Sequence, residues 1–244
     1  PMGGEWCYTA AYLLGKEYAA RLINFAMLLA GVAVLFELLR RHLSRRDAFL
    51  CVTLFASTPL VQLVSGSLFV ENVWMALLLA AFACMLRFRD TWQASHLYLA
   101  ALLAGAALAT KLLAAVYILP LSVFLLYDLW VGIRSGKITR PARLLLITMA
   151  CFILIGIQPY ATALIKTGNP VFPLLNTIFH SPYFDQTGQS SDMRFRKPFQ
   201  WDTLYQLTFR TEQYLEGQAG AFGFQSLIFL PLAAVMLSAH WPYA

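Results

Sequence analysis

Two charged side chains stand at the ends of long apolar runs, where they could do chemistry at a boundary between water and lipid. Glu71 opens the run 72–88 within SGSLFVENVW, and Lys111 divides the apolar stretch from Leu97 to Val131. A carboxylate in such a place either faces a functional site or stabilises a helix start through the helix dipole. A lysine either binds a phosphate as a compact cation or extends its ammonium to the membrane surface. The residue types alone leave both alternatives open.

The remaining candidate residues carry weaker signals. Arg21, just inside the first apolar run, is a second cation of the phosphate-binding type. His180 is a lone histidine, for which a structural role is more usual than catalysis. The sequence contains no nucleophile triad or phosphate-cradling glycine loop, and no Cys or His spacing typical of zinc. We therefore expect no cofactor, and a divalent metal is not indicated.

The composition identifies the class of protein that must position these residues. Of the 244 residues, 59% are hydrophobic and 12% charged, and the mean hydropathy is +0.63. Soluble domains carry about 45–50% apolar and about 25% charged residues, and disordered chains are richer still in charge. Both classes are excluded, which leaves a protein whose apolar segments are solvated by lipid.

Seven apolar runs are interpreted as crossings, although the fourth is short, since a membrane helix needs about 17–25 mainly apolar residues. The stretch from Leu97 to Val131 would be about 52 Å long as one helix, too long for one span. A tight reversal at Thr110–Lys111 is therefore expected. The fold class is all-α, a polytopic membrane protein of about seven transmembrane helices. The runs are Tyr18–Leu39, Ala48–Gly66, Asn72–Phe88, Ser95–Thr110, Leu112–Val131, Leu144–Ile165 and Phe222–Ala239.

The basic residues predict the sidedness of the spans. Ten of the 18 Lys and Arg lie in three loops, at 40–47, 87–90 and 132–143, as the positive-inside rule requires of cytoplasmic loops. This clustering favours a membrane over nucleic acid as the partner. We expect integration in the plasma membrane, the inner membrane of a bacterium. Residues 1–165 would form a bundle of six spans, 166–221 an exported, periplasmic loop, and 222–244 a seventh span with a truncated end.

The expected exported loop has two recognisable parts. TGNPVFPLLN, at 167–176, is typical of a rigid turn. From Asp202, a candidate N-cap, apolar and threonine residues recur at helical spacing as far as Leu215, which predicts a short amphipathic helix on the membrane surface. Because the chain opens at Pro1 and stops just after an apolar run, we expect a fragment with at least one span missing upstream.

Five stretches, taken in order, resemble the polyprenyl-phosphate-sugar-dependent glycosyltransferases of the GT-C class, integral membrane relatives of the protein mannosyltransferases and of the lipid A aminoarabinose transferase. Each motif is short, but together they span nearly the whole chain. They are PMGGEWCYTAAYLLGKEYAARLINF (1–25), STPLVQLVSGSLFVEN (57–72), AGAALATKLLAAVYILPL (104–121), TGNPVFPLLNTIFHSPYF (167–184) and EGQAGAFGFQSLIFLPL (216–232).

The resemblance implies a GT-C-like fold and an inverting transfer. A sugar would move from polyprenyl phosphate to a glycan, lipid or protein acceptor at the exported face, with a carboxylate acting as general base and cations stabilising the phosphate. The main catalytic acid of the class would precede Pro1. Glu71 takes the second acidic position, and Glu5 is the other carboxylate considered catalytic. Substrate-binding residues would be Lys111, Arg21, Asn169 and His180.

Two other classes of function remain open from the sequence. A polysaccharide polymerase or ligase is also polytopic, with arginines in a large exported loop, here Arg194, Arg196 and Arg210. A transporter or a structural membrane subunit is the non-enzymatic alternative. A transporter typically shows paired half-helices and mid-span polar residues, and the mid-span polar residues here are mild, such as Thr148 and Gln158.

Overall fold

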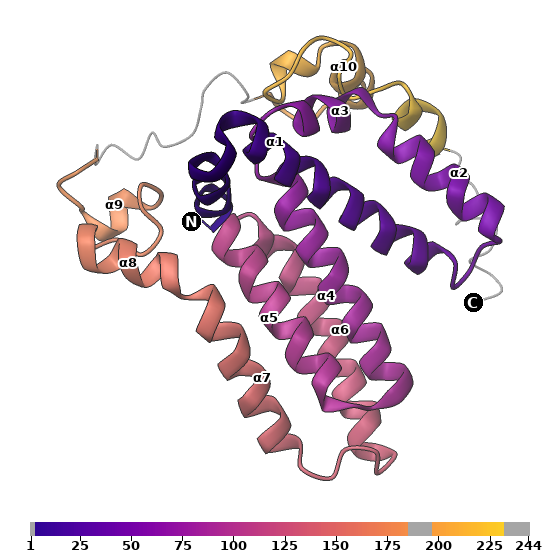
Figure 1. Ribbon diagram of the computed structural model, residues 1–244, viewed down its shortest axis with the longest axis vertical. Coiled ribbons are helices and arrows are strands. Elements are labelled where there is room, and N and C mark those ends of the chain that lie inside the picture. The colour runs from indigo at the N-terminus through magenta and orange to yellow at the C-terminus, as the bar shows by residue number, and fades with distance from the viewer. Residues whose placement is uncertain (1–2, 185–196, 232–244) are drawn as a thin grey trace.

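The computed structural model describes residues 3–184 and 197–231, and its regular structure within those ranges is entirely helical (Figure 1). The elements are α1 (Gly3–Leu39), α2 (Arg45–Ala56), α3 (Pro59–Gly66), α4 (Glu71–Thr91), α5 (Ala94–Thr110), α6 (Ala114–Arg134), α7 (Pro141–Gly156), α8 (Gln158–Thr167), α9 (Asn176–Phe179), α10 (Thr203–Phe209) and the 3-10 turn η2 (Thr211–Gln213). The all-α class predicted from composition is confirmed for these residues.

Helix α1 consists of two helical parts joined at Gly15 and Lys16. Lys16 has φ 55° and ψ −151°, which no helix accommodates, and Gly15 is non-helical as well. The break lies close to Tyr18, where the first apolar run was expected to begin. The short first part therefore lies at the end of the bundle, and the longer second part carries the apolar run.

Two of the expected crossings are bent pairs of helices. Helices α2 and α3 meet at 63°, and α7 and α8 meet at 54°. A proline stands at the start of each second helix, Pro59 in α3 and Pro159 in α8. Proline lacks an N–H and disfavours helical geometry in the residue before it, so a continuous helix ends there.

The seven expected crossings are consequently not confirmed. Three helices of the described residues, α1, α4 and α6, are long and apolar enough to span a membrane, and the number rises to five if each bent pair is one span. Helix α5 is apolar but has 17 residues. Residues 232–239 of the seventh run, 222–239, lie outside the described residues, and the division at 165 and 221 stays a prediction.

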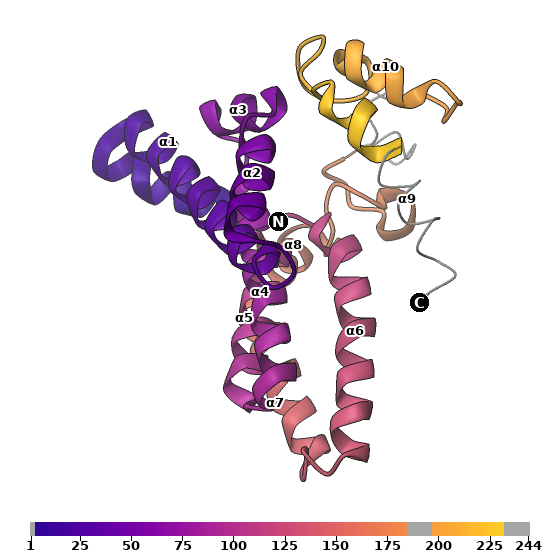
Figure 2. The same cartoon turned by 90° about the vertical axis from the view of Figure 1, so that its right-hand side faces the viewer.

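The central bundle is built around α5, which packs between α4 and α7, while α6 lies alongside (Figures 1 and 2). Small residues allow the close approach. A Cβ at Gly105 of α5 would lie 2.5 Å from the carbonyl oxygen of Phe152 in α7, so only glycine fits. Membrane helices commonly associate through small residues. Because lipid tails are as apolar as the side chains, the hydrophobic effect does not drive their association, and close van der Waals packing does.

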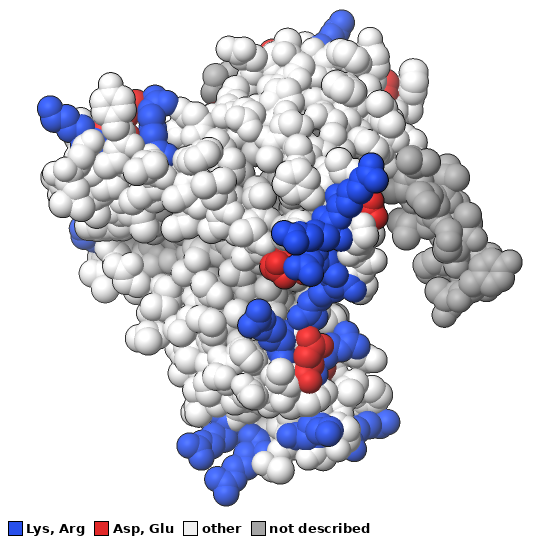
Figure 3. Space-filling view, turned by 45° about the vertical axis from the view of Figure 1, so that its right-hand side comes forward, with Lys and Arg blue, Asp and Glu red and all other residues white. Residues whose placement is uncertain are grey.

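The outer faces of the helices are apolar. Along α6, Leu119 and Val123 are 68% exposed and Leu126 is 61% exposed, at helical spacing on one face. Water would solvate such a stripe poorly, whereas lipid tails would cover it. Figure 3 shows many Lys and Arg side chains in a band that runs down to the lower end of the bundle, with smaller groups at the upper end and uncharged residues over most of the remaining face.

The reversal predicted at Thr110–Lys111 is confirmed. Helix α5 ends at Thr110 and α6 begins at Ala114, so three residues reverse the chain. The link between α3 and α4 lies at the same end of the bundle, and the α4–α5 and α6–α7 connections lie at the opposite end (Figure 1). The basic stretches 87–90 and 132–143 therefore lie at the end of the bundle opposite Lys111, and the side of the membrane that each end faces stays a prediction.

The region after α8 contains short elements. Helix α10 begins after Asp202 as predicted, but it ends at Phe209, well before Leu215. The carboxylate of Asp202 does not cap the helix backbone; it accepts a hydrogen bond from Gln206 Nε2 at 2.9 Å. The polar tract at 185–196, with Arg194 and Arg196, lies outside the described residues.

Candidate active site

Glu71 and Lys111 form an ion pair through Oε1 and Nζ, although 40 positions separate them in the sequence. Glu71 is the first residue of α4, and Lys111 ends α5. Their side chains are 33% and 37% exposed, and the second carboxylate oxygen, Oε2, is buried without a hydrogen-bond partner among the described residues. The pair is therefore partly exposed, while Oε2 of the same carboxylate is buried and keeps an unused capacity to accept a hydrogen bond.

The pair lines a pocket of about 470 Å³. Its apolar wall comes from α3 and the following link, with Leu60, Val64 and Phe69. The opposite wall comes from the segment after η2, which brings Tyr214, Leu215 and Glu216 to the pocket. The pocket therefore combines one cation, two carboxylates and an apolar surface from parts of the chain far apart in sequence.

Two buried asparagines position the link that precedes Glu71. Asn24 of α1 is fully buried and donates from Nδ2 to the carbonyl oxygens of Val64 and Ser67, at 2.8 Å each. Asn72 donates to Asn24 Oδ1 at 3.1 Å. Since polar groups away from water need partners, this network fixes the end of α3 against α1 and sets the place where α4 begins.

The first part of α1 lies against the same link. Tyr8 donates its hydroxyl to the carbonyl oxygen of Phe69 at 2.8 Å. Gly4 lies so close to Val70 that a Cβ there would come within 2.5 Å of a valine methyl group. The N-terminal helix thus packs directly beside the residues that carry Glu71.

Two predicted residues lie near this end without lining the pocket. Arg21 donates to Glu17 Oε1 at 2.6 and 2.9 Å and to the carbonyl oxygen of Gly66, at the end of α3. Glu5 is exposed in the first turn of α1, and its carbonyl oxygen accepts the hydroxyl of Thr9. The catalytic role of Glu5 and the phosphate-binding role of Arg21 stay predictions.

The other two predicted residues lie in the turn after α8. Asn169 is buried, and its amide serves the turn itself: Nδ2 donates to Leu174 O at 2.8 Å, and Oδ1 accepts from Val171 N at 3.0 Å. His180 is exposed and ends α9 in left-handed geometry. Neither lines the pocket, and their substrate-binding roles stay predictions.

Sequence reasoning did not single out Asn24, Asn72, Tyr214 or Glu216. The available signals were an asparagine in an apolar run, and a glutamate that opens EGQAGAFG. Within 3–184 and 197–231, no three His, Cys, Asp or Glu side chains are placed to share a metal ion. The charges that line this pocket are those of Glu71, Lys111 and Glu216.

The chain was compared with known protein families. Residues 1–158 match the family described as dolichyl-phosphate-mannose-protein mannosyltransferase. No curated protein and no solved structure matches the chain significantly. The matched residues include Glu71, Lys111, Asn24 and Asn72, and they make up more than half of the sequence. The chain therefore belongs to the dolichyl-phosphate-mannose-protein mannosyltransferase family, whose members are membrane glycosyltransferases.

Proposed function

We propose that the protein transfers a sugar from a polyprenyl-phosphate carrier to an acceptor at the exported face of the membrane, with inversion at the anomeric carbon. The family supports a lipid-linked donor, and mannose is the first sugar to test. The observation that carries the proposal is the Glu71–Lys111 pair, which lines a pocket at the end of the bundle opposite the α4–α5 and α6–α7 connections. The positive-inside rule assigns this end to the exported side.

Lys111 is the residue that we assign to the donor phosphate. Its ammonium is held at the α5–α6 turn and is partly exposed to the pocket. A polyprenyl phosphate presents an anionic group next to an apolar chain, and the pocket places a cation next to Leu60, Val64 and Phe69. As the bond from the sugar to the phosphate breaks, negative charge grows on the leaving phosphate, and a nearby cation stabilises it.

Glu71 is the residue that we assign to acceptor activation. The acceptor oxygen forms a bond to the anomeric carbon, the bond from that carbon to the phosphate oxygen breaks, and the acceptor proton passes to a carboxylate. In the ion pair, Lys111 holds one oxygen of Glu71. A donor phosphate that binds Lys111 competes with Glu71 for the ammonium, and the carboxylate released from the ion pair can accept the acceptor proton.

Glu216 supplies a second carboxylate to the pocket from outside the region of the family match. A carboxylate is an acceptor of hydrogen bonds and binds hydroxyl groups. We assign Glu216 to hydroxyl groups of the sugar or the acceptor. The segment after η2 would thereby tune which substrates fit, while Glu71 and Lys111 serve the reaction itself.

The proposal requires the pocket to open toward the exported side, which cysteine labelling tests. The native thiols of Cys7 and Cys51 are exposed, so single cysteines belong in a cysteine-free background. In sealed vesicles of known orientation, an impermeant maleimide should label Ser44→Cys and Gln93→Cys only from the cytoplasmic side. Gln218→Cys, two residues beyond Glu216, should be labelled only from the other side. Labelling of positions 44 and 218 from the same side would refute the proposed face.

A further inference from the structure

A second pocket, of about 660 Å³, lies between α1, α4 and α5 near the end of α1. Its inner wall is apolar and made partly of small residues, including Val34, Ala80, Ala83 and Leu99. Its rim carries the guanidinium groups of Arg40, Arg41 and Arg87, with Glu37 as the one carboxylate that lines it. The groove thus has an apolar floor and a cationic edge.

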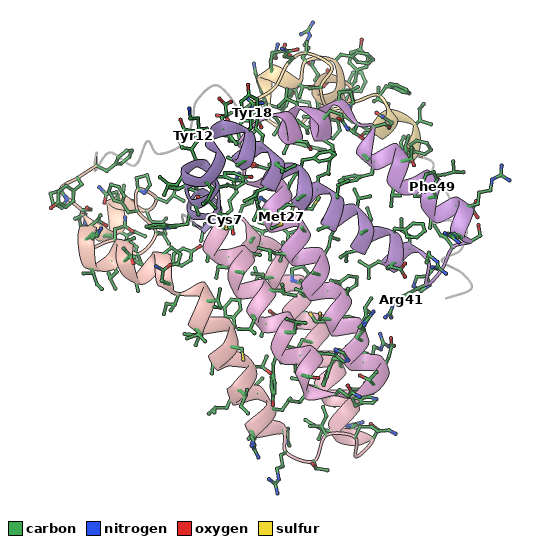
Figure 4. The ribbon with its side chains drawn as sticks, viewed as in Figure 1. Cys7, Tyr12, Tyr18, Met27, Arg41 and Phe49 are labelled. Atoms are coloured by element: carbon green, nitrogen blue, oxygen red, sulfur yellow. The ribbon has the colours of Figure 1, made fainter. Side chains whose placement is uncertain are left out.

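The rim arginines differ in how they are paired. Arg41, labelled in Figure 4, reaches from the end of α1 to Asp90 of α4 at 3.0 Å. Arg40 lies 3.6 Å from Glu37. The side chain of Arg87 has no ion pair or hydrogen bond with any described residue, although it lines the groove between α1 and α4. Within the described residues, the charge of Arg40 is therefore only weakly compensated by Glu37, and the charge of Arg87 is uncompensated.

The position of the groove in the bundle indicates which class of ligand it could bind. It lies at the end of the bundle that carries the basic loops, which the positive-inside rule assigns to the cytoplasmic boundary. Anionic lipids concentrate in the cytoplasmic leaflet, and basic pockets between membrane helices on that side bind their head groups. Guanidinium groups bind phosphate oxygens with directed hydrogen bonds, and an acyl chain needs an apolar wall next to them. Both features meet in this groove.

We propose that this groove binds an anionic phospholipid, with the phosphate against Arg40 and Arg87 and one acyl chain along Ala80, Ala83 and Leu99. The lipid bridges α1 to α4 and α5 at the end of the bundle opposite the Glu71–Lys111 pocket. It is therefore a resident lipid and not the sugar donor. The inference does not depend on the transferase mechanism.

Lipid binding to the purified full-length protein in detergent tests this inference. Phosphatidylglycerol should bind more tightly than phosphatidylcholine of the same acyl chains, by native mass spectrometry. Arg40→Gln and Arg87→Gln should each weaken phosphatidylglycerol binding about fivefold. This factor corresponds to the binding free energy that one basic residue contributes near an anionic membrane surface. Arg87→Lys should retain much of the binding because it retains the charge. Arg46→Gln, in the first turn of α2 and outside the groove, should change binding by less than about twofold.

Two further measurements distinguish binding of a phospholipid from binding of another anionic ligand. Ala83→Leu, which narrows the apolar wall, should weaken phosphatidylglycerol binding with no change in charge. Inorganic phosphate at millimolar concentration should not displace the lipid, because it makes no contact with that wall. Equal binding of the two lipids, an Arg46→Gln loss as large as that of Arg87→Gln, or displacement by phosphate would each overturn the inference. Near-UV circular dichroism confirms that each variant is folded.

Discussion

Glu71→Gln in the full-length protein should lower sugar transfer per folded molecule about 10²–10⁴-fold, the usual contribution of a positioned acid–base group. Glutamine keeps the size of the side chain and its hydrogen-bonding reach, but it cannot accept a proton at neutral pH. The carboxylate belongs to a residue that lines the pocket, and its buried Oε2 has no hydrogen-bond partner among the described residues. Initial rates at saturating donor and acceptor, normalised to folded protein, measure the effect.

Asp90→Asn provides the matched control. Asp90 pairs with Arg41 at the opposite end of the bundle, so this change also removes one carboxylate from an ion pair at a helix end. Exposed ion pairs contribute about 0–1 kcal/mol to stability, and transfer should be nearly unchanged. If Glu71→Gln retained more than about a third of the parental turnover, far above the general acid–base loss, Glu71 would have no catalytic role.

Lys111→Met should raise the KM for the polyprenyl-phosphate donor about 10- to 100-fold, since hydrogen bonds to charged groups contribute about 1.5–3 kcal/mol. Lys111→Arg should keep a substantial part of donor binding, because the proposal requires a positive charge and not a particular fork geometry. The acceptor KM should change little. Steady-state kinetics with the donor and the acceptor varied separately would show the difference.

The double variant Glu71→Gln/Lys111→Met distinguishes a functional pair from a structural one. If the two side chains only hold the ends of α4 and α5 together, each single change leaves a partner uncompensated and the double change relieves it. Transfer per folded molecule would then recover in the double variant. If both side chains act on substrates, the double variant should be at least as slow as the slower single variant.

The sequence predicted the features that depend on local pattern and on membrane physics. Composition requires a lipid-solvated helical protein, and the length of the stretch from Leu97 to Val131 requires a reversal at Lys111. Because successive spans alternate in direction, Glu71 and Lys111 were both expected at one end of the bundle. Their pairing in the structure follows from that alternation and from opposite charge.

The features that escaped prediction depend on tertiary contacts. Pro59 and Pro159 bend two expected spans, yet proline in a membrane helix is also tolerated without a break when neighbours satisfy the backbone. Nothing in the local pattern shows that Asn24 holds the carbonyl groups of Val64 and Ser67. Glu216 reaches the pocket only because the segment after η2 folds back over α3, a long-range contact that periodicity does not encode.

The central claim is that this protein moves a sugar from polyprenyl phosphate to an acceptor with inversion. It is tested most directly by incubating the purified full-length protein with labelled polyprenyl-phosphate mannose and a candidate acceptor, and determining the anomeric configuration of the product by NMR. The account predicts transfer of the label, with a product linkage opposite in configuration to that of the donor. Retention of the donor configuration, or transfer from a nucleotide sugar but not from the polyprenyl-phosphate sugar, would contradict it.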